Sequence, residues 1–303
     1  MSNIINTKIK FLRNLKDKKF NCNAQEKDKQ EVLDICLKAV EQCGYKCAKL
    51  NDINKSAIAK LISSNHLEQE FIYKYTDTAC STIDDVTIQI NGANHIEIFA
   101  SDNNIDQAYI KVKPVDKALC NKLNFAYSDK YGFLMPDIKD IGSGMLIECL
   151  IILPALARVG SLNKIPNFID KLSFDIVCVD RQSGLCKIST KSTLGYSEKQ
   201  ICELVKMYIS KVLEYEVETS KRLGVQDEDE IKDRFCRASA ILNNCIKISP
   251  AEAYCLLGDI LIGVNSGLCN ENIQKIINAL NCINLYENNY KDLAKNIQKN
   301  IKK

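Results

Sequence analysis

Arginine is scarce in this sequence, which has six arginines against 35 lysines, two histidines and no tryptophan. Both basic side chains are positively charged, but only arginine has the planar fork that donates two parallel hydrogen bonds to one phosphate. A phosphate site built from lysine therefore lacks these paired bonds. The net charge of +3 is small, so we expect neither nucleic acid nor a membrane surface as a partner.

Long hydrophobic segments are also missing. The longest apolar stretch, Met145–Ala157, has 13 residues and contains Glu148, so it is too short to cross a bilayer and is interpreted as a buried helix. Met1–Asn14 has no apolar core of the kind found in signal peptides. The 15 cysteines include no CxxC pair, so we expect no metal site. Without an export signal, we expect reduced thiols and a cytoplasmic location.

The spacing of apolar residues predicts a mixture of helices and strands. Residues 1–28 are rich in lysine and are expected to run over the surface, with one short strand at Ile9–Leu12. Two β-hairpins are predicted, one around Asn91-Gly92 and one around the turn Asp180–Gly184. A further strand is expected at 131–134, and helices are expected at 32–43, 56–63, 104–123, 144–158 and from Ser197 onward.

Beyond Gly224 the apolar pattern is helical only. Ser249, followed by Pro250 and Glu252, is typical of a helix start. An acidic stretch, Asp227–Glu230, precedes these helices. We therefore predict an α+β fold with two domains, an antiparallel sheet flanked by helices in residues 1–225 and a small all-helical interaction domain in residues 226–303.

Five separated segments have a pattern that resembles one known family. They are Asn6–Leu15 (NTKIKFLRNL), Asn91–Glu97 (NGANHIE), Phe125–Leu156 (beginning FAYSDKYGFL), Ile188–Glu198 (ISTKSTLGYSE) and Ala240–Leu268. In this order they are similar to segments of the bacterial protein-arginine kinases, which are ATP:guanido phosphotransferases. The resemblance covers nearly the whole chain, and it implies a guanido-kinase catalytic-type domain in residues 1–225.

The resemblance implies a ring of arginines that clamps the nucleotide phosphates. The two arginines of the family pattern S-S-R-I-R correspond here to Lys8 and Lys10. The arginine that ends N-E-E-D-H-L-R corresponds to Glu97, and the arginine after G-T-G-x corresponds to Leu146. Arg181 stands near the position of the arginine in R-G-x-Y-G-E-G. We expect Lys8, Lys10 and Arg181 to be what remains of the nucleotide site, weakened by the residues at positions 97 and 146.

The resemblance also implies glutamates that hold the substrate guanidinium and assist its deprotonation. The two glutamates and the aspartate of N-E-E-D correspond to Gly92, Ala93 and Asn94. The loop R-G-x-Y-G-E-G is shortened to the turn at 180–184, and the family's C-P-T-N stretch is replaced by Asp137–Asp140. We therefore assign no catalytic residue and treat positions 92–94 as degenerate.

The histidines and the C-terminal helix each have two interpretations. His66 and His95 fall in family positions, and a packed structural role is favoured over catalysis. Lys291, Asp292 and Lys295 have the spacing of the family's phosphoarginine-binding motif R-D-x-x-R-A, with lysine in place of both arginines. The other interpretation of this segment, a solvated amphipathic helix, is the favoured one.

Three functions are compatible with these residues. The first is a pseudokinase, a regulatory or binding protein in cytosolic protein quality control that pairs with itself, with an active arginine kinase or with a AAA+ unfoldase system. The second is an active protein-arginine kinase in which Lys8, Lys10 and a carboxylate such as Glu97 or Asp137 replace the usual groups. The third is a purely structural or interaction role of the helical domain. We expect no cofactor, and Mg-ATP only if activity is retained.

Overall fold

The computed structural model describes residues 3–63, 66–67, 69–75, 77–168, 174–283 and 289–302. The strands are β1 (Ile4–Arg13), β2 (Ala48–Lys49), β3 (Ala79–Ile83), β4 (Val86–Ile90), β5 (Ile96–Asp102), β6 (Tyr127–Ser128), β7 (Gly132–Phe133), β8 (Met145–Ile152), β9 (Phe174–Asp180) and β10 (Leu185–Thr190). The helices are α1 (Glu26–Gln42), α2 (Lys55–Ser63), α3 (Gln69–Lys74), α4 (Ile105–Cys120), α5 (Pro154–Arg158), α6 (Glu198–Gln226), α7 (Glu228–Asn244), α8 (Pro250–Asn265), α9 (Ile273–Cys282) and α10 (Tyr290–Lys302). Short 3-10 turns lie at Leu50–Asp52, Ile138–Asp140 and Leu162–Phe168.

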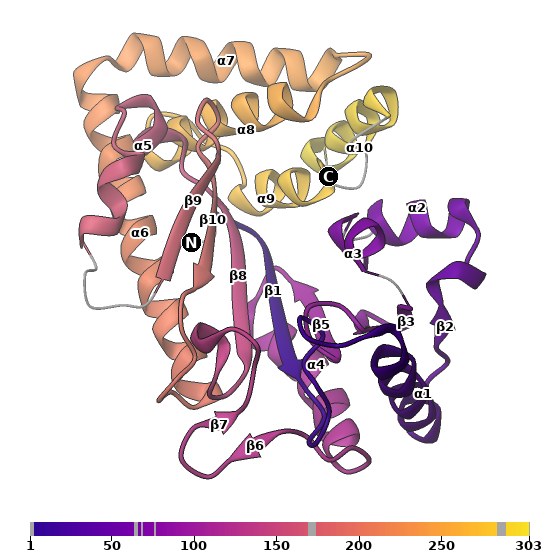
Figure 1. Ribbon diagram of the computed structural model, residues 1–303. Helices are drawn as coiled ribbons and strands as arrows, with labels where there is room; N and C mark the ends of the chain where they lie inside the picture. Colours follow the sequence, from indigo (N-terminus) through magenta and orange to yellow (C-terminus); the bar gives the residue numbers. More distant parts are fainter. Residues whose placement is uncertain are drawn as a thin grey trace. The chain divides into compact units, whose positions relative to one another are not determined.

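The chain divides into two compact units. The sheet unit consists of Thr7–Glu148 and Thr190–Val205, and the helical unit consists of Met1–Asn6, Cys149–Ser189 and Lys206–Lys303. Eight strands are hydrogen-bonded in the order β2-β3-β4-β5-β1-β8-β10-β9 (Figure 1). The neighbours from β2 to β1 pair antiparallel. A sheet with flanking helices, followed by helices alone, confirms the predicted α+β class.

Strand β1 is longer and more buried than expected. Ile9 and Phe11 are fully buried, whereas Lys8 and Lys10 alternate with them on the partly exposed face. The prediction that residues 1–28 run over the surface is therefore wrong for this strand. Alternation of apolar residues with lysine is the pattern of a strand with one covered face.

The helix predicted at 144–158 is wrong. This segment forms β8 and then the short helix α5, which begins at Pro154. The length of the apolar stretch favours a helix, but β8 alternates buried and partly buried residues, and its partly buried face is also apolar at Leu146 and Leu150. Pro154 has no N–H to donate to a strand ladder, and the first turn of a helix tolerates it.

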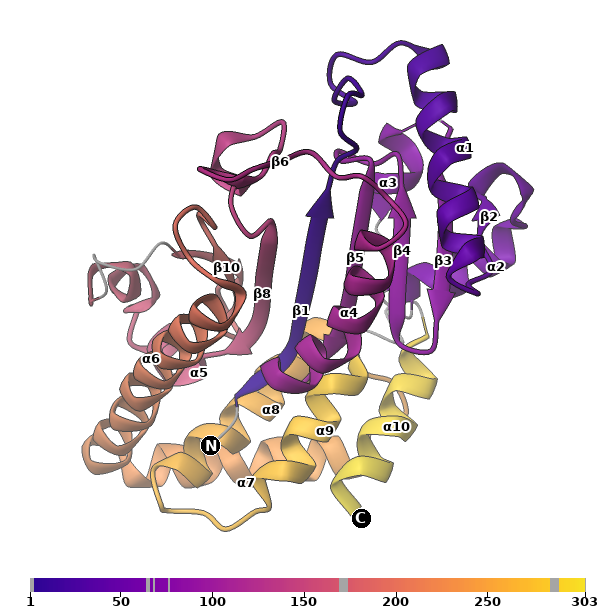
Figure 2. The ribbon, with the colours of Figure 1, turned by 90° about the horizontal axis from the view of Figure 1, so that it is seen from below.

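Within the sheet unit, α4 packs along β5 and β4 (Figure 2). Asn104 caps this helix by accepting hydrogen bonds from the backbone N–H groups of Asp106 and Gln107. Its buried face is apolar and consists mainly of Ile105, Ala108, Val112, Val115 and Leu119. The predicted helix at 104–123 and the hairpin of β4 and β5 are both confirmed.

Within the helical unit, α8 packs against α7 and α9, and α10 packs against α7 and α9 (Figure 1). The predicted start of α8 is confirmed, because the Ser249 hydroxyl accepts a hydrogen bond from the N–H of Glu252 at 3.2 Å. The predicted second hairpin is present as β9 and β10. The domain limit at residue 225 stays a prediction, and the chain ends α6 and starts α7 on either side of Asp227. Among the described residues, no helix combines the length and apolar character needed to cross a membrane.

Candidate functional site

Lys8, Lys10 and Glu97, three of the positions predicted for the nucleotide site, lie together on one face of the sheet. Lys8 and Lys10 extend from β1, and the register places Lys10 opposite Phe99 and Leu12 opposite Glu97 on β5. Residues opposite each other in an antiparallel pair share a face. The nitrogens of Lys8 and Lys10 are 4.5 and 5.5 Å from the centre of the Phe99 ring, within reach of cation–π attraction.

Glu97 is engaged on both carboxylate oxygens. Oε2 lies 3.2 Å from Nζ of Lys10, and the two side chains are only 9% and 16% exposed. Oε1 accepts hydrogen bonds from the backbone N–H and the side-chain amide of Asn94, at 3.4 and 3.3 Å. Because burial reduces screening by solvent, Glu97 offsets the positive charge of Lys10 more strongly than a surface carboxylate would.

Leu146 lies on β8, the neighbour of β1 in the sheet. It is two residues beyond Gly144, whose carbonyl oxygen accepts a hydrogen bond from the N–H of Leu12 at 2.8 Å. Its side chain is partly buried and has no hydrogen-bond donor. This position therefore adds no charge to the face formed by Lys8, Lys10 and Glu97.

The loop between β4 and β5 holds the three positions where the family pattern has carboxylates. Asn91 opens the loop with φ of 63°. The Gly92 carbonyl accepts a hydrogen bond from the Asn21 amide at 3.0 Å, and a Cβ at Gly92 would lie 3.2 Å from the Phe71 ring. Ala93 is exposed, and Asn94 is buried with its Oδ1 accepting from the Asn14 amide at 2.9 Å. No carboxylate extends from positions 92–94.

His95 uses both ring nitrogens inside the protein. Its Nδ1 accepts from the N–H of Leu15 and its Nε2 donates to the carbonyl oxygen of Lys19, each at 2.9 Å. Burial lowers its pKa, which keeps the ring neutral. His66 lies with Nδ1 2.9 Å from the hydroxyl of Thr87. Packed, hydrogen-bonded rings of this kind agree with the structural role that was favoured for both histidines.

Asp140 is a carboxylate that the sequence analysis did not single out. The pKa of Asp140 is raised to about 6, chiefly by burial; the positive charges of Lys139 and Lys10 oppose this rise, and the negative charges of Asp137 and Glu97 add to it. Asp137 differs, because it is exposed and pairs with Lys139 at 3.1 Å. The signal for Asp140 was its position in the segment that replaces C-P-T-N, but sequence alone did not separate it from Asp137.

Arg181 belongs to the helical unit and is exposed at the turn between β9 and β10. Asp180 closes this turn by accepting hydrogen bonds from the backbone N–H groups of Gln182 and Ser183 at 3.2 and 3.1 Å. The turn has no glutamate. The assignment of Arg181 to a phosphate site stays a prediction.

Lys291, Asp292 and Lys295 lie on the first turns of α10, also in the helical unit. Lys295 pairs with Asp292 at 3.7 Å between exposed side chains. Asn289 caps the helix by accepting a hydrogen bond from the Asp292 N–H at 3.3 Å. Leu293 and Ile297 on the opposite side are buried, as expected for an amphipathic helix. The phosphoarginine role of this segment stays a prediction.

Arg13 heads a buried charge network that the sequence analysis missed. Its guanidinium has no exposed surface, and its Nε lies 2.9 Å from Asp116. Asp116 and Glu198 both pair with Lys113, at 3.1 and 2.7 Å. Glu198 also accepts a hydrogen bond from the Tyr109 hydroxyl at 2.7 Å. An arginine within an alternating apolar strand is the sequence signal for such a network, because a buried cation needs a partner.

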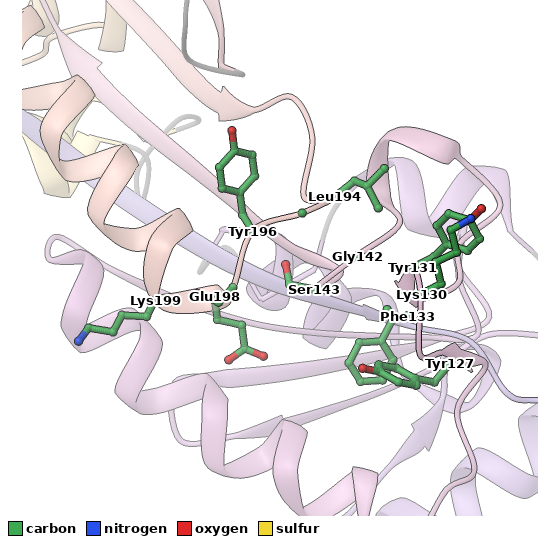
Figure 3. Close-up of a pocket in the computed structure, with 13 residues that line it drawn as sticks. Tyr127, Lys130, Tyr131, Phe133, Gly142, Ser143, Leu194, Tyr196, Glu198 and Lys199 are labelled. Carbon is green, nitrogen blue, oxygen red and sulfur yellow. The ribbon is translucent and has the colours of Figure 1, made fainter.

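A pocket of about 810 Å³ opens in the sheet unit, next to this network (Figure 3). One wall is the β6–β7 pair, where Tyr127 and Phe133 pack edge to face with ring centres 5.2 Å apart. The other wall is the segment that leads into α6, including Tyr196 and Lys199. The lining residues are Tyr127, Lys130, Tyr131, Gly132, Phe133, Gly142, Ser143, Leu194, Gly195, Tyr196, Ser197, Glu198 and Lys199.

Comparison with known proteins matches residues 29–219 to the family model described as "ATP:guanido phosphotransferase, C-terminal catalytic domain". The chain belongs to the ATP:guanido phosphotransferase family. Its curated relatives include the protein-arginine kinase of Halothermothrix orenii, 25% identical over 88% of this chain and 80% of that protein. The protein-arginine kinase of Syntrophomonas wolfei is 26% identical over 88% of this chain and 78% of that protein. The resemblance inferred from the sequence is thus confirmed.

Solved structures support the fold of this ATP:guanido phosphotransferase homologue. The duplicated taurocyamine kinase of Schistosoma mansoni matches with a TM-score of 0.61 and 18% identity, over 70% of this chain and 32% of that longer one. A lombricine kinase matches with a TM-score of 0.62 and 14% identity, over 76% of this chain and 69% of that chain. At this identity the likeness concerns the fold alone.

Proposed function

We propose that this chain is a degenerate protein-arginine kinase homologue, a pseudokinase with a regulatory or binding role in cytosolic protein quality control. The observation that supports this most directly is the ion pair between Glu97 and Lys10, 3.2 Å long and largely buried. The family pattern has arginine at both positions. The Glu97 carboxylate therefore pairs with the Lys10 ammonium, which would otherwise be available to bind a phosphate.

Phosphoryl transfer depends on cations that neutralise the developing charge and on groups that position the reactants. In this chain Lys10 is already neutralised, Leu146 has no donor, and positions 92–94 have no carboxylate. Loss of one electrostatic or base contribution lowers an enzymatic rate by roughly 10²–10⁴. Several independent losses together are incompatible with useful catalysis. The residues present therefore do not fit the phosphates of Mg-ATP.

A reversion experiment tests this proposal. Titration calorimetry with Mg-ATP should give weak or no binding for the wild type. Glu97→Arg combined with Leu146→Arg should raise the affinity at least about 10-fold, because each restored arginine can bind phosphate in a bidentate manner. Glu26→Arg, an exposed charge reversal on α1, should change nothing. Tight Mg-ATP binding by the wild type would contradict the proposal.

The setting and partners follow from the family resemblance alone. We expect a homodimer or a heterodimer with an active arginine kinase, or association with a AAA+ unfoldase system. Sedimentation of the purified chain, alone and mixed with an active protein-arginine kinase, distinguishes a homodimer from a heterodimer. A chain that stays monomeric in both samples would contradict the dimer.

A second candidate is an active kinase with lysine in the phosphate clamp. Asp140 favours it, because a half-buried carboxyl with a pKa of about 6 near Lys10 has the properties of a general base. Mass spectrometry should find no phosphoarginine on a protein substrate incubated with the wild type and Mg-ATP. Phosphoarginine that disappears in Asp140→Asn, but persists in Asp137→Asn, would support the active kinase instead.

A further inference from the structure

We propose that the pocket between the β6–β7 pair and the start of α6 binds an acidic peptide segment of a partner protein. In this arrangement an apolar or aromatic side chain of the peptide packs among the tyrosines, and its carboxylates bind Lys130 and Lys199. This inference does not depend on whether the chain transfers phosphate.

Exposed aromatic side chains mark the pocket as a contact surface. Tyr127, Tyr131 and Tyr196 are 56%, 47% and 39% exposed, and all three line it. Leu194, on the same rim, is 43% exposed. Exposed large apolar groups that gather at one hollow indicate a binding site, and tyrosine is enriched at protein interfaces.

The backbone around the pocket is already held in place. The Phe133 N–H donates to the Gly142 carbonyl oxygen at 2.8 Å, and the Thr193 N–H donates to the Lys139 carbonyl oxygen at 3.2 Å. A Cβ at Gly142 would lie 2.5 Å from the Thr193 carbonyl oxygen, so only glycine fits between these segments. A preformed site loses less conformational entropy when a peptide binds.

The charges select against a cationic ligand. One face of the Phe133 ring is covered by the Arg13 guanidinium at 3.7 Å, and the Tyr131 ring by the Lys130 ammonium at 4.9 Å. At these two rings a further cation would meet one that is already bound. Glu198 could have attracted it, but its oxygens are engaged by Lys113 and by the Tyr109 hydroxyl, each at 2.7 Å.

The remaining charge at the rim is positive. Lys199 is 87% exposed, and its contact with Glu203 is long, at 3.9 Å between exposed groups. Lys130 is exposed and contacts the Tyr131 ring. Such weakly paired lysines attract carboxylates and guide their approach.

Peptide carboxylates suit this rim better than the phosphates of a nucleotide do. The lining has no arginine fork, and its two lysines are exposed point charges. A volume of about 810 Å³ accepts one or two large side chains and leaves room for an extended backbone. Lys130 and Lys199 lie on opposite sides of the pocket (Figure 3), so they match acidic residues that flank an apolar one.

Selection from a random 12-residue peptide library displayed on phage tests the proposal with the full-length chain. The expected consensus has at least two Asp or Glu residues around a large apolar one. A synthetic peptide with this consensus should bind the wild type and lose at least about 10-fold in affinity on Lys130→Glu with Lys199→Glu, since charge reversal turns attraction into repulsion.

Lys27→Glu with Lys38→Glu, two exposed reversals on α1 in the same unit, is the matched control and should leave peptide binding unchanged. Circular dichroism of each variant establishes that it is folded. Tyr196→Ser should weaken peptide binding without any change of charge. The proposal is overturned by a consensus without acidic residues, by equal binding to both double variants, or by a fluorescent ATP analogue that displaces the peptide from the wild type.

Discussion

At the scale of single residues, Arg13 shows how much one buried cation can determine. Its guanidinium is fully buried, paired with Asp116 and stacked 3.7 Å from Phe133. Lysine at this position would keep the charge but lose the fork and the flat stacking surface. We expect Arg13→Lys to lower the free energy of unfolding in urea by about 2–4 kcal/mol. Arg237→Lys makes the same substitution in an exposed pair with Asp233 and should change the free energy of unfolding by less than about 0.5 kcal/mol.

Glu216 predicts a dependence of stability on pH. It is fully buried on α6, its two oxygens accept hydrogen bonds from the N–H groups of Ala155 and Leu156 at 2.7 and 2.9 Å, and burial raises its pKa to about 7. A carboxyl whose pKa is raised on folding binds its proton more tightly in the folded state. Its contribution to stability is therefore fully present below about pH 4.5 and is lost as the pH rises through 7.

Urea unfolding of the wild type and of Glu216→Gln between pH 5 and 8 measures this effect. The stability of the wild type relative to the variant should fall by roughly 2–4 kcal/mol over this window, because each pKa unit corresponds to about 1.4 kcal/mol. Glu218→Gln, on the exposed side of the same helix, should give a difference that does not vary with pH. A wild type that gains stability over Glu216→Gln as the pH rises would show that the two N–H groups outweigh burial.

At the scale of elements, the β9–β10 hairpin depends on Gly184. This residue has φ of 77°, and an added Cβ would lie 2.3 Å from the carbonyl oxygen of Leu153. Gly184→Ala should destabilise the protein by roughly 3 kcal/mol or more in urea unfolding. Gly44 has a similar φ of 83° with open space around it, so Gly44→Ala should lower the free energy of unfolding by only about 1 kcal/mol. Equal effects would mean that conformational strain, rather than the clash, decides both.

At the scale of the whole molecule, the C-terminal helices share their core with residues from elsewhere in the helical unit. The cluster formed by α7–α10 also includes Ile5, Ile152 and Leu185. A fragment of residues 226–303 should therefore be helical by circular dichroism but unfold at lower urea concentration than the full chain. An unstructured spectrum would contradict the prediction of a separable domain in these residues.

Local signals explain which parts of this fold could be predicted from sequence. Asn91-Gly92 and Ser249-Pro250 are turn and cap signals that depend on a few adjacent residues, and the predicted elements appear there. The apolar segment at Met145 is assigned to a helix because Leu146 and Leu150, on the partly buried face of β8, hide the alternation that identifies a strand. Arg13 and Asp116 are 103 positions apart, so no local pattern could join them. The same is true of Asp140, whose raised pKa depends on tertiary neighbours.

The pairing of Lys10 with Glu97 also determines how this face of the sheet responds to salt. The affinity of a free cationic site for phosphate falls as the ionic strength rises, because salt screens their attraction. Lys10 has its counter-charge built into the chain, 3.2 Å away, so little net charge is left for salt to screen. An anion that binds Lys10 must displace the Glu97 carboxylate. Because this carboxylate is part of the same chain, its concentration near Lys10 does not fall on dilution. We therefore expect residual anion binding at Lys10 to be weak at every ionic strength, and low salt should not restore it.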